Sequence, residues 1–125
     1  MKTPKGYQTV MPYLIVDGAA NFIDFTKKVF NAVEKEEMRS MRDEKTIQHS
    51  EIMIGDSTIM FADSTENYKS STAGLFIYVE NADKTYQKAI DEGATTIMEL
   101  SDQDYGRTCG VKDPFGNVWW ITSVK

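Results

Sequence analysis

The sequence predicts an α+β fold in which two β-α-β-β-β modules form one cupped, mixed sheet. The first observation behind this prediction is a repeat. Apolar strand-like runs and one helix-like run follow the same order twice, displaced by about 63 residues. The second is that each half has a single helix, which covers one face of its sheet. The opposite face is therefore left for the other half, a partner chain or a ligand.

The repeat divides the chain into two modules joined by a polar segment. A length of 125 residues corresponds to a single domain, residues 1–125. Module one covers about residues 6–64, the linker about 65–72, and module two about 73–125. The linker lacks hydrophobic periodicity, which is typical of a loop.

The first module begins with the apolar run YLIV, residues 13–16, and then changes its period. Phe22, Phe25 and Val29 recur at helical spacing, and Asn31 follows near the expected end of the helix. These positions predict an amphipathic helix directly after the first strand.

The rest of the first module is predicted to be strands. IQHSEIMIGDSTIMFAD, residues 47–63, reads as two antiparallel strands around a two-residue Gly-Asp turn. This register pairs Glu51 with Met60, and alternation places His49 on the same face as Glu51, away from the helix. The charged stretch EKEEMRSMRD, residues 34–43, is expected to be an exposed strand.

The second module repeats this order. GLFIYVENA, residues 74–82, contains a strand, and Asn81 is placed to cap a helix that stops at Gly93. The segment ATTIMEL, residues 94–100, is expected to be a strand, and residues 107–124 read as a strand, a turn and a strand.

The turn DPFGN, residues 113–117, either connects two strands or introduces a strand that carries metal ligands. Proline fixes φ and glycine permits a positive φ, so the residues are suited to a tight turn. If Asp113 faces Asn117 across the turn, Gly110 lies beside Trp120 and leaves room over its ring.

Composition limits the classes of partner. The formal net charge of −5 and the pI of about 4.8 argue against a nucleic-acid partner and would tolerate a cationic ligand. No apolar run is long enough to cross a membrane. Cys109 is the only cysteine, so an intrachain disulfide and a multi-thiolate metal site are excluded. A cytoplasmic location is expected.

Strand alternation also predicts which side chains line the concave face. Aromatic and methionine side chains dominate this face, and they suit a planar or apolar ligand. The alternative is that they pack against the other half or a second subunit. The predicted ligand-binding residues are Met11, Tyr13, His49, Glu51, Met53, Met60, Phe76, Tyr78 and Trp120.

The doubled module, the hairpin HSEIMIGDSTIMFAD and the ending YGRTCGVKDPFGNVWWI resemble the vicinal oxygen chelate superfamily. That superfamily includes glyoxalase I, extradiol dioxygenases, fosfomycin-resistance proteins and bleomycin-resistance proteins. The hairpin is similar to that of small bacterial glyoxalase/bleomycin-resistance-like proteins. The resemblance implies the glyoxalase/bleomycin-resistance/dioxygenase fold and a homodimer.

The resemblance also locates the positions that hold a divalent metal in the enzymes of the superfamily. They fall at Met11, Met60, Gly74 and Trp120, none of which offers an oxygen or imidazole donor. Catalytic zinc and facial-triad iron sites need several histidines or carboxylates, and this chain has one histidine. We therefore expect no metal and no other cofactor.

Three functional hypotheses remain. The preferred one is a metal-independent protein that binds a partly aromatic small molecule, because the resistance-type relatives act by sequestering a drug. The second is a glyoxalase-like lyase or isomerase that uses His49 and Glu51, with or without a divalent metal. An isolated His-x-Glu is more often only a solvated pair on a strand. The third is a structural or regulatory dimer without a ligand. The sequence alone does not decide whether the protein is an enzyme.

Overall fold

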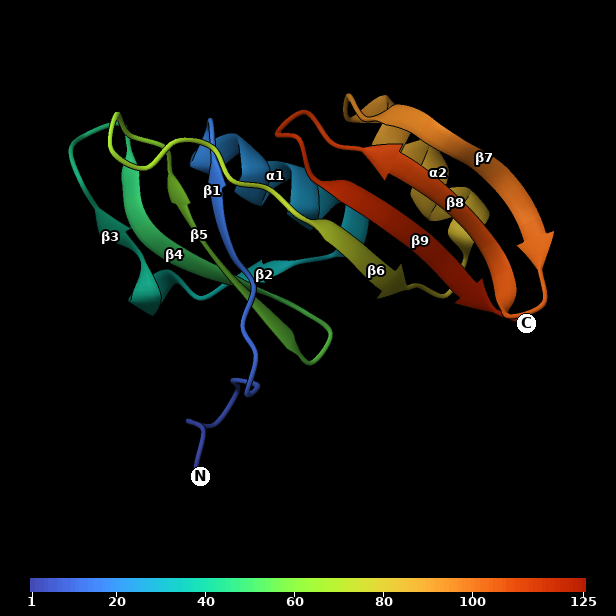
Figure 1. Ribbon diagram of the computed structural model, residues 1–125, viewed down its shortest axis with the longest axis horizontal. Coiled ribbons are helices and arrows are strands. Elements are labelled where there is room, and N and C mark those ends of the chain that lie inside the picture. Colours follow the sequence, from blue (N-terminus) through green and yellow to red (C-terminus); the bar gives the residue numbers. More distant parts are fainter. The chain divides into compact units, whose positions relative to one another are not determined.

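The computed structural model describes residues 1–125 and confirms the α+β prediction, but the strands form two separate mixed sheets where one sheet was expected. The chain divides into two compact units, each built on a mixed sheet (Figure 1). The first unit comprises Met1–Lys27 and Asn31–Ser71, and the second comprises Lys28–Phe30 and Thr72–Lys125. Neither helix is long and apolar enough to span a bilayer.

The first unit contains five strands, a 3₁₀ turn and one helix, of which the last three residues, Lys28–Phe30, belong to the second unit. The elements are β1 (Tyr13–Val16), α1 (Ala19–Phe30), β2 (Val33–Glu34), the 3₁₀ turn η1 (Glu36–Met38), β3 (Ser40–Met41), β4 (Ile47–Ile54) and β5 (Ser57–Asp63). The sheet order is β1-β5-β4-β2, and β3 also pairs with β4. Only the β1–β5 pair is parallel. The helix α1 begins after Gly18 and ends at Asn31, as the helical spacing predicts.

The second unit repeats this plan. Its elements are β6 (Gly74–Tyr78), α2 (Ala82–Asp91), β7 (Thr95–Gln103), β8 (Gly106–Lys112) and β9 (Val118–Val124). The order β6-β9-β8-β7 matches that of the first sheet element for element, and α2 lies against one face of the sheet (Figure 1). The predicted cap is confirmed, because the Asn81 side chain accepts a hydrogen bond from the backbone N–H of Lys84 at 3.1 Å.

The expected exposed strand over residues 34–43 is wrong. The segment forms two short strands with η1 between them. The reason is the buried carboxylate of Glu34, which accepts hydrogen bonds from Nε and Nη2 of Arg39 at 2.7 and 2.5 Å and from Oγ of Ser50 at 2.6 Å. Residues five positions apart in an extended strand are too far from each other to form an ion pair. The backbone between Glu34 and Arg39 therefore turns, which interrupts the strand.

Both predicted strand registers are confirmed. Glu51 lies opposite Met60 in the β4–β5 hairpin, and Gly110 lies opposite Trp120 in the β8–β9 hairpin. A Cβ atom on Gly110 would come within 2.4 Å of the Trp120 ring, so glycine is required for the ring to lie across this strand. Trp119 points to the helix-covered face and is only 1% exposed.

The DPFGN segment is a turn organised by one buried carboxylate. Oδ1 of Asp113 accepts hydrogen bonds from the backbone N–H groups of Phe115 and Asn117, each at 2.9 Å. Its Oδ2 accepts from the Asn117 side chain at 3.1 Å and from Nε1 of Trp119 at 2.8 Å. The acidic side chain of this motif is therefore used to build the hairpin.

The core of each unit lies between its sheet and the helical residues. In the first unit, Phe22 and Phe61 meet edge to face with ring centroids 5.1 Å apart. In the second, the ring of Phe30 lies 4.5 Å from Trp119. Cys109 is fully buried on the same face as Trp119, and burial raises the pKa of its thiol to about 11. A buried thiol with a raised pKa is a poor nucleophile, so Cys109 serves as a small core residue.

Candidate functional site

The face of the first sheet that points away from α1 carries the predicted polar pair. The register places Tyr13 opposite Met60 and Met60 opposite Glu51, which gives a row of three side chains across β1, β5 and β4. His49 lies two residues before Glu51 on β4 and shares its face. Strand alternation alone therefore located the centre of this face.

Hydrogen bonds connect these residues into a chain. Nε2 of His49 lies 2.8 Å from Oε2 of Glu51, and Nδ1 of His49 lies 2.9 Å from the hydroxyl of Tyr13. In the neutral tautomer that donates from Nε2 to the Glu51 carboxylate, Nδ1 accepts a hydrogen bond from the Tyr13 hydroxyl. Burial and the charge of Glu51 raise the pKa of Tyr13, which keeps that hydroxyl protonated at neutral pH.

Glu51 is only 1% exposed because two further residues cover it. The hydroxyl of Tyr7 donates to Oε1 of Glu51 at 2.6 Å, and Nζ of Lys35 lies 3.7 Å from the same oxygen. Lys35 also lies 4.0 Å above the Tyr7 ring. Sequence reasoning missed both residues: Tyr7 precedes the first strand, and Lys35 lies in the segment wrongly expected to be an exposed strand.

This environment perturbs two pKa values in opposite directions. Burial raises the pKa of Glu51, but the hydrogen bonds from Tyr7 and His49 and the charge of Lys35 outweigh burial and leave the pKa below its ordinary value. The hydrogen bond to Glu51, together with burial, raises the pKa of Tyr7. Glu51 is therefore ionised and Tyr7 neutral at neutral pH.

We expect the free energy of unfolding to decrease as the pH falls below about 4.5, the ordinary pKa of a glutamate. The folded protein holds Glu51 at a lower pKa, so the unfolded chain binds the proton first and is favoured. The stabilisation is complete above the unfolded value and is lost as the pH falls through the folded value. Urea denaturation across this range should show a shallower pH dependence for Glu51→Gln than for the wild type. An identical dependence in the variant would show that Glu51 does not contribute.

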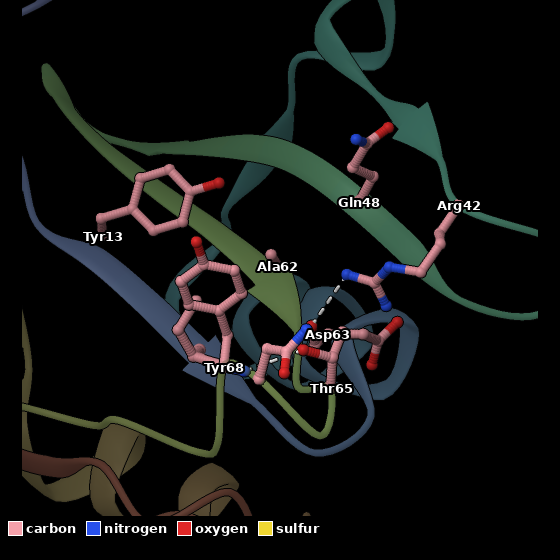
Figure 2. Close-up of a pocket in the computed structure, with 9 residues that line it drawn as sticks. Tyr13, Arg42, Gln48, Ala62, Asp63, Thr65 and Tyr68 are labelled. Carbon is pink, nitrogen blue, oxygen red and sulfur yellow. Dashed lines mark hydrogen bonds between the residues drawn. The ribbon is translucent and has the colours of Figure 1, made fainter.

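A pocket with a volume of about 660 Å³ lies in the first unit, beside this chain of hydrogen bonds. We refer to it as the linker pocket. Its walls on the sheet are Tyr13, Ile15, Gln48, Ala62 and Asp63. The remaining walls are Arg42, after β3, and Thr65, Asn67 and Tyr68 in the linker. Figure 2 shows the rings of Tyr13 and Tyr68 on one side and Arg42 and Gln48 on the other.

The linker is held in place along β1. Ile15 and Ser71 exchange backbone hydrogen bonds of 3.0 and 2.9 Å, and the N–H of Ser64 donates to the carbonyl of Val16 at 3.0 Å. These bonds lay residues 64–71 beside the open edge of the sheet. No pattern in the linker predicts this wall, because a polar segment without periodicity is interpreted as a solvated loop.

The second unit has its own aromatic surface on the sheet face opposite α2. Phe76 lies opposite Trp120, and the Phe76 and Tyr78 rings meet edge to face at 5.3 Å. Phe76 is 51% exposed and Tyr78 is 66% exposed. These three predicted ligand-binding residues share one face, as alternation indicated. A single site formed by residues of both units stays a prediction.

Tyr13 is the only predicted ligand-binding residue that lines the linker pocket, and Met11 and Met53 also lie apart from the hydrogen-bonded chain of His49 and Glu51. Met11 precedes Tyr13, the first residue of β1, and therefore lies outside the strand. Met53 lies opposite Thr58, next to the end of the β4–β5 hairpin. Neither lines the pocket.

The donor set does not fit the divalent metal that enzymes of this fold hold. No group of three or more His, Cys, Asp or Glu side chains is arranged to bind an ion. Met60 and Trp120 occupy equivalent positions in the two sheets, and neither offers a ligand that a hard cation prefers. Both oxygens of Glu51 already accept hydrogen bonds.

The fold and these motifs identify a protein family. The family model of the Glyoxalase/Bleomycin resistance protein/Dioxygenase superfamily matches residues 7–121, and the chain belongs to this superfamily. The uncharacterized protein Mb0911c of Mycobacterium bovis is 36% identical over 118 residues, which cover 86% of this chain and 78% of the relative.

Solved structures share the fold. A glyoxalase/bleomycin resistance protein/dioxygenase family enzyme from Burkholderia phytofirmans superimposes with a TM-score of 0.76 at 24% identity, covering 92% of this chain and 97% of its own. TnmS3, an antibiotic binding protein from a Streptomyces species, gives a TM-score of 0.69 at 13% identity, covering 95% and 100%. At these identities the likeness shows the fold alone.

Proposed function

We propose that this protein binds a small, partly aromatic molecule in the linker pocket and does so without a metal ion. The observation that carries the proposal is the pocket itself. Its volume of about 660 Å³ falls in the range of small-molecule sites, roughly 300 to 1,000 Å³. Apolar walls with a few polar groups are typical of such sites.

The walls favour an aromatic ligand. Tyr13 is 47% exposed and Tyr68 is 71% exposed, so both side chains are accessible to a ligand. Ala62, on β5, is buried. The hydrogen bond to His49 fixes the Tyr13 ring, so little side-chain entropy is lost on binding. That TnmS3 of the same fold is an antibiotic binding protein supports this choice over the other functions of the superfamily.

We expect Tyr68→Ala to weaken the binding of N-phenylnaphthylamine (NPN), an uncharged aromatic dye, by about two- to tenfold. Loss of one ring–ring contact removes roughly 0.5 to 1.5 kcal/mol of binding free energy, in addition to the contribution of the buried apolar area. A change of about 1.4 kcal/mol in binding free energy corresponds to a factor of ten in affinity. The measurement is the rise in NPN fluorescence on titration with folded protein.

Tyr105→Ala is the matched control, because Tyr105 is an exposed tyrosine of the second unit that does not line the pocket. Equal losses in both variants, or no saturable NPN binding to the wild type, would contradict the proposal. Trp120→Ala in the same titration tests whether the second unit contributes to the site. Unchanged affinity would exclude that contribution.

A second candidate is a lyase or isomerase that uses His49 as a base oriented by Glu51. The observation in its favour is that the hydrogen-bonded chain Glu51–His49–Tyr13 ends at a pocket wall. Hemithioacetal turnover that disappears in His49→Ala would support an enzyme. Elemental analysis of untagged protein, with the same assay in added divalent metal, would show whether such turnover depends on an ion.

We also propose that the protein is a cytoplasmic homodimer. The exposed aromatic surface of Phe76, Tyr78 and Tyr105 supports association, because monomers rarely expose several large apolar side chains together. Light scattering of the purified protein would reveal a monomer if the proposal is wrong. A dimer would also be compatible with the structural role considered above.

A further inference from the structure

Arg42 differs from the other two arginines of the chain in having no carboxylate partner. Arg39 forms a two-pronged ion pair with Glu34. Arg107 donates to both oxygens of Asp83, at 3.0 and 3.3 Å. Arg42 forms no ion pair, so its guanidinium is the one arginine charge that remains available to a ligand.

The structure holds Arg42 in position at the linker pocket. Its backbone N–H donates to the carbonyl of Thr46 at 2.9 Å, and one guanidinium N–H donates to the backbone carbonyl of Asp63 at 3.2 Å. The guanidinium points toward the centre of the pocket, across from Tyr13 and Tyr68 (Figure 2). A guanidinium carries five donors, so most of them stay free.

Two carboxylates near Arg42 are already engaged. Oδ1 of Asp63 accepts from the N–H groups of Gly18 and Ala19 at the start of α1, and Oδ2 accepts from Ile47, at 3.1, 2.8 and 2.7 Å. Three donors and the helix dipole compensate this buried charge. Oδ1 of Asp43 accepts from the backbone of the next turn, and its pKa is lowered chiefly by those hydrogen bonds, with only a small effect of Arg42.

Gln48 adds a neutral donor on the same side of the pocket. Its carbonyl oxygen accepts a hydrogen bond from Oγ of Ser40 at 3.1 Å, which leaves its amide N–H groups as donors. Figure 2 shows Gln48 on the same side of the pocket as Arg42, with its amide turned away from the guanidinium. One end of the pocket therefore carries a cation and an amide, and the other carries two aromatic rings.

We propose that the ligand of the linker pocket is a planar aromatic molecule bearing an anionic oxygen group, a carboxylate, sulfate or phosphate. Arg42 binds the anion, and the rings of Tyr13 and Tyr68 contact the aromatic body. This inference rests on the proposed function. Although the net charge of the protein is −5, the local positive charge of Arg42 would attract an anionic ligand to the pocket. The planar guanidinium suits such groups because two parallel N–H donors match two oxygens.

Two dyes of the same shape provide the test. Anilinonaphthalenesulfonate (ANS) has the aromatic body of NPN with an added sulfonate. We expect the wild type to bind ANS about tenfold more tightly than NPN, which corresponds to one charge-assisted hydrogen-bonded contact. Raising the salt concentration should weaken ANS binding and leave NPN binding unchanged.

Arg42→Gln should weaken ANS binding about tenfold relative to NPN binding, and so abolish the preference for ANS. Lys45→Gln is the matched control, because it removes the same charge from the same loop at a residue outside the pocket. It should keep the preference. Near-ultraviolet circular dichroism establishes that each variant is folded.

The possible failures are distinguishable. If both dyes bind the wild type equally, or if Arg42→Gln keeps the preference for ANS, the anionic ligand class is overturned while small-molecule binding stands. Equal loss of the preference in Lys45→Gln would also overturn the anionic ligand class. The overall positive charge of the loop, and not a direct contact with Arg42, would then explain the effect. If neither dye binds saturably, the proposed function itself fails.

Discussion

Asp113→Ala is expected to lower the free energy of unfolding by about 3 to 5 kcal/mol. The Asp113 carboxylate is 4% exposed and accepts four hydrogen bonds, from two backbone N–H groups, the Asn117 amide and the indole of Trp119. Truncation leaves these donors buried without an acceptor, at a cost of roughly 1 to 3 kcal/mol each before relaxation and entry of water. Chemical denaturation followed by circular dichroism measures the loss.

Asp113→Asn separates charge from shape. An asparagine keeps one acceptor oxygen, but its N–H₂ group replaces the other oxygen and faces the donors that this oxygen accepted from. We therefore expect a loss of stability between those of the wild type and Asp113→Ala. Asp104→Ala is the control, because Asp104 is an exposed acidic residue in the β7–β8 turn. Its replacement should change stability by less than about 0.5 kcal/mol. A loss below about 1 kcal/mol in Asp113→Ala would show that the hairpin does not depend on the carboxylate.

We expect Asp63→Ala to lower the free energy of unfolding by about 2 to 4 kcal/mol. Gly18, which precedes α1, has no side chain to cap the helix, and Asp63 provides the acceptor from β5 instead. The same carboxylate accepts from the N–H of Ile47, so one side chain connects the helix start to two strands. Denaturation by urea, with the wild type at the same pH, gives the difference.

Hydrogen exchange locates the origin of this loss. Faster exchange of the Gly18, Ala19 and Ile47 amides in Asp63→Ala is expected, with little change in the second unit. Asp63→Asn should keep one acceptor and lose about half as much stability. Uniformly faster exchange with no local excess would contradict the role assigned to Asp63.

The fold was predictable because its signals are local. Period-two alternation and a two-residue turn predict the β4–β5 register, and Asp113 facing Asn117 across the DPFGN turn predicts that of β8–β9. The segment 34–43 was mispredicted because its many charged residues were interpreted as the sign of a solvent-exposed strand. Its structure depends on the buried pair of Glu34 and Arg39, whose geometry alternation does not encode.

The candidate site was predictable only in part. The pairing of His49 with Glu51 follows from their spacing on one strand, and Tyr13 follows from the first strand. Tyr7 reaches Glu51 from a segment outside the sheet, and no periodicity anticipates such a contact. The same is true of Tyr68 and Arg42, which a loop and a turn bring to the pocket.

The linker is both the connection between the units and a wall of the pocket, and this has an evolutionary consequence. Substitutions at Thr65, Asn67 or Tyr68 change the shape of the wall, yet none of these side chains contributes to the buried core of either sheet. With the proposed ligand bound in this pocket, ligand preference can therefore diverge between descendants of this chain while the scaffold is inherited unchanged. Selection for a new compound would act first on these positions.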